Sequence, residues 1–89
     1  MKSFTYTIKA EHGLNERPAS EMVTLTKKFP ESEIRITKCD RSVKTNQIML
    51  LLALGVEYGD TVTITVNGGD EQAALNAMQE FMEIHKSRR

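Results

Sequence analysis

The chain has 89 residues and a formal net charge of zero, from twelve basic and twelve acidic side chains. This length fits one domain with a modest core, and the balanced charge removes the electrostatic basis for general nucleic-acid binding. The single cysteine, Cys39, excludes an intramolecular disulfide and is typical of a loop thiol in a reducing cytoplasm. No segment predicts a signal peptide or a membrane anchor, so we expect a cytoplasmic protein without membrane association.

The N-terminal third of the chain predicts a strand followed by a helix. Residues 3 to 9 alternate apolar and polar side chains, as a half-buried strand does. Apolar residues at helical spacing follow Asn15, which is a suitable N-cap, and Pro18 fits the first helical turn. We expect this helix to end near Phe29, because Pro30 cannot continue the backbone hydrogen bonds.

The middle of the chain predicts a hairpin and a short helix. Residues 33 to 37 and 41 to 44 have the composition of two strands joined by a polar turn. The side chains of Thr45 and Asn46 are suited to capping a helix over residues 47 to 54.

The last third predicts the end of that helix, a strand and a long helix. Gly55 would end the short helix in the left-handed conformation. Residues 61 to 66 alternate again, and Asp70 would cap a helix that carries an apolar stripe, formed by Ala74, Ala77, Met78, Phe81 and Met82.

These elements have the order βαββαβα in a single domain over residues 1–89. Strands and helices mixed in this way favour an α+β sandwich, in which helices cover one face of an antiparallel sheet. Periodicity alone leaves the order of the strands open.

One segment, Gly13-Leu14-Asn15-Glu16-Arg17-Pro18-Ala19, should lie where the first strand leads into the first helix. A helix start presents unpaired N–H groups and the positive end of a dipole, and a guanidinium suits phosphate oxygens. We therefore expect an anion site formed by Asn15, Glu16 and Arg17. Because Asn15 has no nucleophilic atom of the kind that forms phosphoenzymes, the site should hold an anion without carrying it covalently.

This segment resembles the phosphorylation motif Gly-Leu-His-X-Arg-Pro-Ala of HPr, the histidine-containing phosphocarrier of the bacterial sugar phosphotransferase system, except at Asn15. The resemblance covers essentially the whole chain and implies an HPr-like open-faced sandwich. In that fold, three helices lie on one face of a four-stranded antiparallel sheet of order 1-4-2-3. The matching segments, in family order, are Gln47-Ile48-Met49, Leu54-Gly55-Val56, Val62-Thr63-Ile64 and Asp70-Glu71-Gln72-Ala73-Ala74.

A second departure from the family concerns regulation. The resemblance places Gln47 at the position of a serine that a dedicated kinase phosphorylates in Gram-positive members, in the context Lys-Ser-Ile-Met. This chain has Asn46-Gln47-Ile48-Met49 there, so kinase control at this position is not expected. The catabolite-repression HPr homologue also lacks the histidine, but it keeps that serine.

The resemblance also implies a binding surface for Enzyme I and the sugar permease subunits, formed by Arg17, Ser20, Ile48, Met49 and Leu52. Two nearby glutamates, Glu16 and Glu21, should weaken an encounter with the acidic surfaces of those partners. The adjacent Leu50 and Leu51 make the run more apolar, which would support self-association.

We therefore expect a degenerate HPr-like protein that is not an enzyme, needs no metal or cofactor, and acts by protein contacts or anion sensing. Phosphotransferase-system components, a transcriptional regulator, and phosphate or a similar anion are the expected partners. The alternative is a working phosphocarrier that takes phosphate from Enzyme I on His12, or in which Asn15 is an engineered substitution. A structural or oligomerising module is a third hypothesis. A surface role is the simpler interpretation of His12, and His85 should complement the negative end of the last helix.

Overall fold

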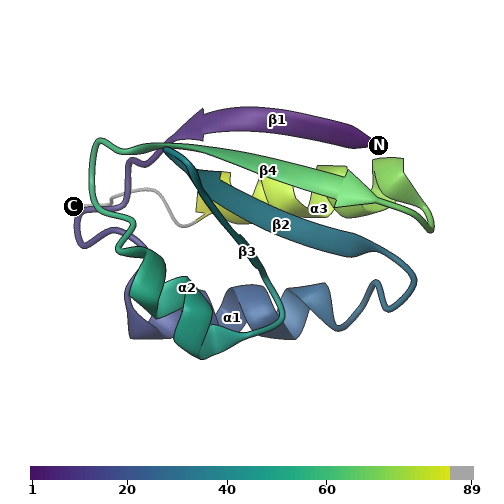
Figure 1. The fold of residues 1–89 in the computed structure, drawn as a ribbon, viewed down its shortest axis with the longest axis horizontal. Helices are drawn as coiled ribbons and strands as arrows, with labels where there is room; N and C mark the ends of the chain where they lie inside the picture. Colours follow the sequence, from purple (N-terminus) through teal and green to yellow (C-terminus); the bar gives the residue numbers. More distant parts are fainter. Residues whose placement is uncertain (85–89) are drawn as a thin grey trace.

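A computed structural model of the chain describes residues 1–84. The four strands form one antiparallel sheet in the order β1-β4-β2-β3, and all three helices lie on the same face of it (Figure 1). This confirms the expected element order, strand order and α+β architecture. The elements are β1 Lys2–Thr7, α1 Glu16–Thr26, β2 Glu33–Lys38, β3 Arg41–Lys44, α2 Ile48–Leu54, β4 Thr61–Asn67 and α3 Glu71–Ile84.

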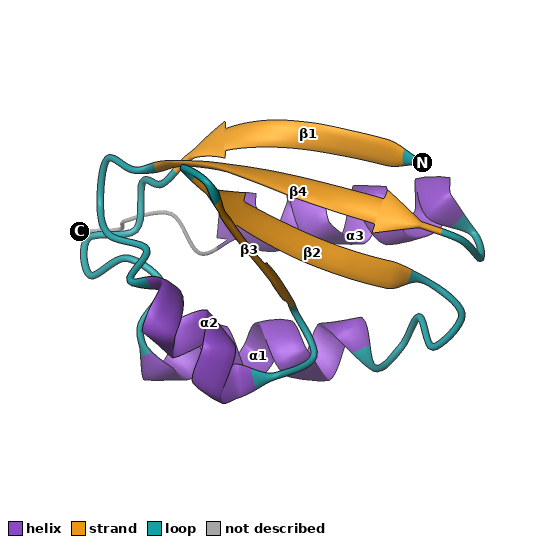
Figure 2. Cartoon of the chain, in the orientation of Figure 1, coloured by secondary structure: helices purple, strands orange, loops and turns teal. Residues whose placement is uncertain are grey.

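The helices divide the covered face of the sheet between them. The long helix α3 packs under β1 and β4, while α2 packs against β3 and against α1 (Figure 2). Within residues 1–84, no helix combines the length and the apolar character that are needed to cross a bilayer.

Strand alternation separates the two faces of the sheet. On the covered face, strand residues such as Ile36 and Ile64 are fully buried, and they meet Met22 of α1 and Met78 of α3. The other face is polar: the hydroxyls of Thr5 and Thr63 lie 3.4 Å apart on neighbouring strands, and other exposed hydroxyl side chains flank them. The period of two in the sequence therefore corresponds to one buried and one solvated face.

Two elements end earlier in the structure than the sequence predicted. Strand β1 ends at Thr7 and not at residue 9, and α1 ends at Thr26 and not at Phe29. The N–H groups of Lys28 and Phe29 donate to carbonyls only three residues back, at 3.0 Å each. A tight turn therefore replaces the last expected helical turn ahead of Pro30.

The helix caps predicted from the sequence are present at two helix ends and absent at two others. Gly55 ends α2 with φ +72°, and the Asp70 carboxylate accepts the N–H of Ala73 at 3.1 Å, as expected. Asn15 occupies the N-cap position of α1, but its side chain makes no capping hydrogen bond. At α2 the N-cap position belongs to Gln47, again without a side-chain bond, so capping by Thr45 or Asn46 was wrong.

The reason for the second departure is the burial of Thr45. Its hydroxyl lies 2.7 Å from the hydroxyl of Thr26 and 3.3 Å from the Ile34 carbonyl oxygen. Both threonines are buried. The Thr45 side chain therefore joins the end of α1 to β2 and is turned away from the start of α2.

Candidate functional site

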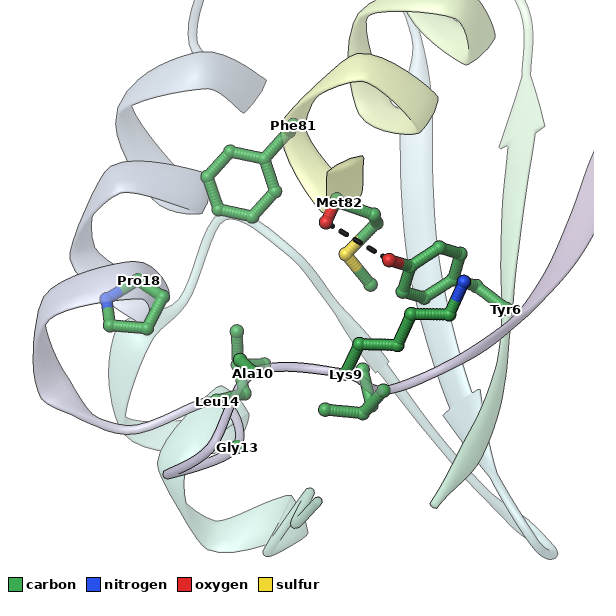
Figure 3. A pocket seen from close by; sticks show the side chains of 9 residues that line it. Tyr6, Lys9, Ala10, Gly13, Leu14, Pro18, Phe81 and Met82 are labelled. Atoms are coloured by element: carbon green, nitrogen blue, oxygen red, sulfur yellow. Dashed lines mark hydrogen bonds between the residues drawn. The ribbon is translucent and has the colours of Figure 1, made fainter. Parts of the chain in front are cut away.

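The expected anion site lies at the start of α1, next to the loop that follows β1 (Figure 3). Asn15 is extended, with φ −86° and ψ −164°, and its carbonyl accepts the Ala19 N–H at 2.9 Å. Because Pro18 has no N–H, the N–H groups of Glu16 and Arg17 are the donors that the first helical turn leaves without an intrahelical partner. Asn15, Glu16 and Arg17 are all exposed.

The loop before α1 is held tightly by backbone contacts. Gly13 has φ +67°, and a Cβ atom there would lie 2.4 Å from the Val56 carbonyl oxygen and 2.7 Å from Glu57 Cα. Leu14, which is buried, donates its N–H to the same Val56 carbonyl at 3.0 Å. Only a glycine permits this approach, and it sets the direction in which the chain enters α1.

The charges at this helix start partly offset one another. The Arg17 side chain is 89% exposed, and its Nε lies 3.7 Å from a Glu21 carboxylate oxygen one turn along α1. Glu16 adds a carboxylate in the first turn, where it interacts favourably with the helix dipole. The site therefore offers backbone donors to an anion, but its guanidinium already has an acidic neighbour.

The residues of the expected partner surface lie on two helices that pack side by side, α1 and α2. Ser20 and Met49 are exposed, with Met49 at 75%, whereas Ile48 and Leu52 are half-buried against the core. Leu51 is fully buried and Leu50 is 42% exposed. The expectation that Leu51 supports self-association is therefore wrong, because the core already covers its side chain.

Three further positions from the sequence analysis are His12, Gln47 and His85. His12 is exposed in the turn after β1, and Gln47 is exposed at the start of α2. His85 lies outside the described residues. Within residues 1–84, no group of three or more His, Cys, Asp or Glu side chains is placed to hold a metal ion.

A small apolar cavity lies behind the start of α1, and the sequence did not suggest it. Its lining includes Tyr6, Leu14, Pro18 and Phe81, and its volume of about 20 Å³ is close to the space of one water molecule (Figure 3). The Tyr6 hydroxyl donates to the Met82 carbonyl at 3.2 Å, and burial, followed by the charge of Glu83, raises the pKa of Tyr6. Tyr6 thus ties β1 to the end of α3, a contact between residues 76 positions apart in the chain.

Comparison with known proteins gives a consistent family assignment. Residues 2–83 match the family described as PTS HPr component phosphorylation site. The chain is 38% identical over 76 residues to the HPr-like protein Crh of Halalkalibacterium halodurans, an alignment that covers 85% of this chain and 89% of that protein. It is 35% identical over 88 residues to the phosphocarrier protein HPr of Mycoplasma genitalium, covering 97% and 98%.

The chain is also similar to a much longer protein and to proteins of known structure. It is 39% identical over 77 residues to the multiphosphoryl transfer protein of Vibrio cholerae, in an alignment that covers 83% of this chain but only 19% of that protein. The crystal structure of HPr-C-His from Thermoanaerobacter tengcongensis superposes with a TM-score of 0.88 at 36% identity, covering 93% of this chain and 92% of that one.

Proposed function

The chain belongs to the PTS-HPr family, and on that premise we propose that it is a protein-binding relative of the phosphocarriers that does not itself carry phosphate. HPr phosphocarriers are carrier proteins of the phosphotransferase system, and the solved structure of Bacillus subtilis Crh, which is described as a catabolite-repression protein, connects the family with catabolite regulation. The proposed location is the cytoplasm, where a chain with one exposed thiol stays reduced.

A single observation supports this proposal, namely the residue at the N-cap of α1. Asn15 stands in the motif position where the family's phosphorylation sequence has histidine, and it lies between the buried Leu14 and the first turn of the helix. A carboxamide has no free electron pair on nitrogen that is basic enough to attack a phosphoryl group. The scaffold that presents the acceptor is kept, and the acceptor is replaced.

The test is phosphoryl transfer from phosphoenolpyruvate and Enzyme I to the purified protein. We expect no acid-labile phosphate on the wild type, and measurable labelling of the Asn15→His variant. His12→Ala in each background reports whether the exposed His12 takes part. Labelling of the wild type that disappears in His12→Ala would identify a working phosphocarrier and end the proposal.

We further propose that the N–H groups of Glu16 and Arg17 bind phosphate or a similar anion weakly. The two donors lie next to each other, and the helix dipole favours negative charge there. In a phosphate titration followed by amide NMR, these two signals should move, with a dissociation constant on the order of millimolar. The amide of Ala73, whose N–H is already bonded to the Asp70 carboxylate, is the internal control.

The proposed protein-binding surface consists of Arg17, Ser20, Ile48, Met49 and Leu52, and its partners would be phosphotransferase-system proteins or a transcriptional regulator. Enzyme I is a practical probe. Met49→Asp should weaken its binding without unfolding the protein, because Met49 is 75% exposed. Ser3→Asp, at an exposed position of β1, is the matched control. Equal loss of binding in both variants would place the contact elsewhere.

A further inference from the structure

Lys38, at the end of β2, connects two segments that are distant in the sequence. Its side chain is only 25% exposed. The ammonium donates to the Gly55 carbonyl at 2.6 Å and lies 2.9 Å from the Asp60 carboxylate. Gly55 ends α2, and Asp60 ends the turn that leads into β4, so one lysine joins the end of a helix to the following turn.

The Asp60 carboxylate also organises that turn. The oxygen that faces Lys38 accepts the N–H of Glu57 at 2.8 Å, and the Asp60 N–H donates to the Glu57 carbonyl at 3.0 Å. The hydrogen bond from Lys38, followed by that from the Glu57 backbone, lowers the pKa of Asp60. The same carboxylate therefore pairs with Lys38 and stabilises the turn through the Glu57 N–H.

The loop before α1 is joined to this turn by backbone hydrogen bonds. The Ile8 N–H donates to the Asp60 carbonyl at 2.8 Å, and the Gly59 N–H donates to the Ile8 carbonyl at 3.0 Å. Leu14 in turn bonds the Val56 carbonyl at 3.0 Å. Both ends of the loop that leads to Asn15 are thus hydrogen-bonded to residues 56 to 60, at the same end of the molecule (Figure 1).

We infer that Lys38 is a positioning residue, which holds the end of α2 and the start of α1 in one fixed arrangement through the turn at residues 56 to 60. An ammonium can donate three hydrogen bonds, and a partly buried ion pair is screened less by solvent than an exposed one. The inference rests on the proposed function in one respect: the groups that Lys38 positions are those of the proposed anion and partner sites.

The test compares Lys38→Met, which keeps the length of the side chain and removes its charge, with Lys38→Arg, which restores the donors. Lys44→Met is the matched control, since Lys44 is an exposed lysine at the far end of the same hairpin. Native-state hydrogen exchange of the Leu14 amide and the chemical shifts of the Glu16 and Arg17 amides are recorded without any ligand, beside urea unfolding.

In Lys38→Met, we expect the Leu14 amide to exchange on the order of tenfold faster and the Glu16 and Arg17 signals to move. Lys38→Arg should restore both, and Lys44→Met should leave both unchanged. Should Lys38→Met fail to fold, Asp60→Asn removes the ionic partner, and its amide group still offers an oxygen to the Glu57 N–H.

Unchanged Leu14 exchange and unchanged Glu16 and Arg17 shifts in the folded Lys38→Met or Asp60→Asn variant would overturn the inference. An equal change in Lys44→Met would overturn it too, because it would point to general destabilisation. These measurements use no phosphate and no partner. Labelling of the wild type by Enzyme I would therefore end the proposed function while leaving the positioning result intact.

Discussion

At the scale of single residues, the start of α1 depends on small local features whose effects are separable. Gly13 sets the path of the loop, Asn15 stands where we propose that the phosphate acceptor has been replaced, and a Glu21 carboxylate oxygen lies 3.7 Å from the Arg17 guanidinium. Each acts through one contact or one functional group. Substitutions at these positions can therefore be matched with controls elsewhere in the chain.

Gly13→Ala tests the close approach of the loop to Val56. The new methyl group would lie 2.4 Å from a backbone oxygen at φ +67°, so we expect a loss of about 3 kcal/mol or more in the free energy of unfolding. Gly55→Ala has a similar φ but open space around the Cβ position, and it should cost about 1–2 kcal/mol. Urea unfolding measures both. Equal losses would mean that the contact with Val56 contributes nothing.

Glu21→Gln tests the competition for Arg17. An exposed ion pair is worth at most about 1 kcal/mol, so releasing Arg17 should tighten phosphate binding at the Glu16 and Arg17 amides up to about fivefold. The control is Glu31→Gln, which removes an exposed carboxylate beyond the other end of α1. An unchanged dissociation constant in the NMR titration would show that Glu21 does not compete with the anion for Arg17.

At the scale of secondary-structure elements, a buried pair of hydroxyls joins the end of α1 to the segment between β3 and α2. Thr26 and Thr45 lie 2.7 Å apart, and the Thr26 hydroxyl also donates to the Met22 carbonyl at 2.8 Å. The position of α2 beside α1 thus depends on a polar contact inside the core as well as on apolar packing.

A double-mutant cycle measures that contact. Thr45→Val should lower the free energy of unfolding by about 1–2 kcal/mol, because the buried Thr26 hydroxyl keeps the Met22 carbonyl but loses its hydrogen bond with Thr45. Adding Thr26→Val should cost less than the sum of the single changes, by about 0.5–1.5 kcal/mol. Thr24→Val, at an exposed position of the same helix, should change stability by less than about 0.5 kcal/mol. Strict additivity would contradict the pairing.

At the scale of the whole molecule, ion pairs connect segments that lie far apart in the chain. The N-terminal ammonium lies 3.0 Å from the Glu71 carboxylate, which ties the start of β1 to the start of α3. Lys38 and Asp60 connect β2 to the turn before β4. Three carboxylates with lowered pKa values, those of Glu33, Asp60 and Glu71, make the stability of the fold depend on pH.

We expect the free energy of unfolding to fall as the solution is acidified. The hydrogen bond from the Gly68 N–H and then that from the N-terminal ammonium lower the pKa of Glu71 from its ordinary value of 4.5, and Lys38 lowers that of Asp60 from 3.8. Around these ordinary values the unfolded chain binds more protons than the native one, so stability rises with pH. The stability that these carboxylates contribute is fully present above their ordinary pKa values, and it is lost as the pH falls through their lowered pKa values.

Urea unfolding from neutral pH down to about pH 3 measures this dependence. Glu71→Gln should flatten part of the slope, because it removes one of the three carboxylates. A free energy of unfolding that stays constant over this range would contradict the role assigned to these contacts.

The sequence alone determined the features that depend on near neighbours. The strand alternation, the left-handed end of α2 at Gly55 and the cap at Asp70 follow from local hydrogen bonding and backbone sterics. The strand order came from the family resemblance, since local patterns do not say which strands pair. That Asn15 cannot carry phosphate stays a prediction, and the sequence suffices to make it because it concerns the chemistry of one side chain.

Only the tertiary structure decided which distant residues meet. The burial of Thr45 and Leu51 and the contact of Lys38 with Asp60 depend on how the elements pack together. Lys38 and Asp60 carry ordinary surface charges in the sequence, with no spacing that pairs them. Such contacts form after the chain has closed its long loops, so their geometry is set by the packing of whole elements and not by neighbouring side chains.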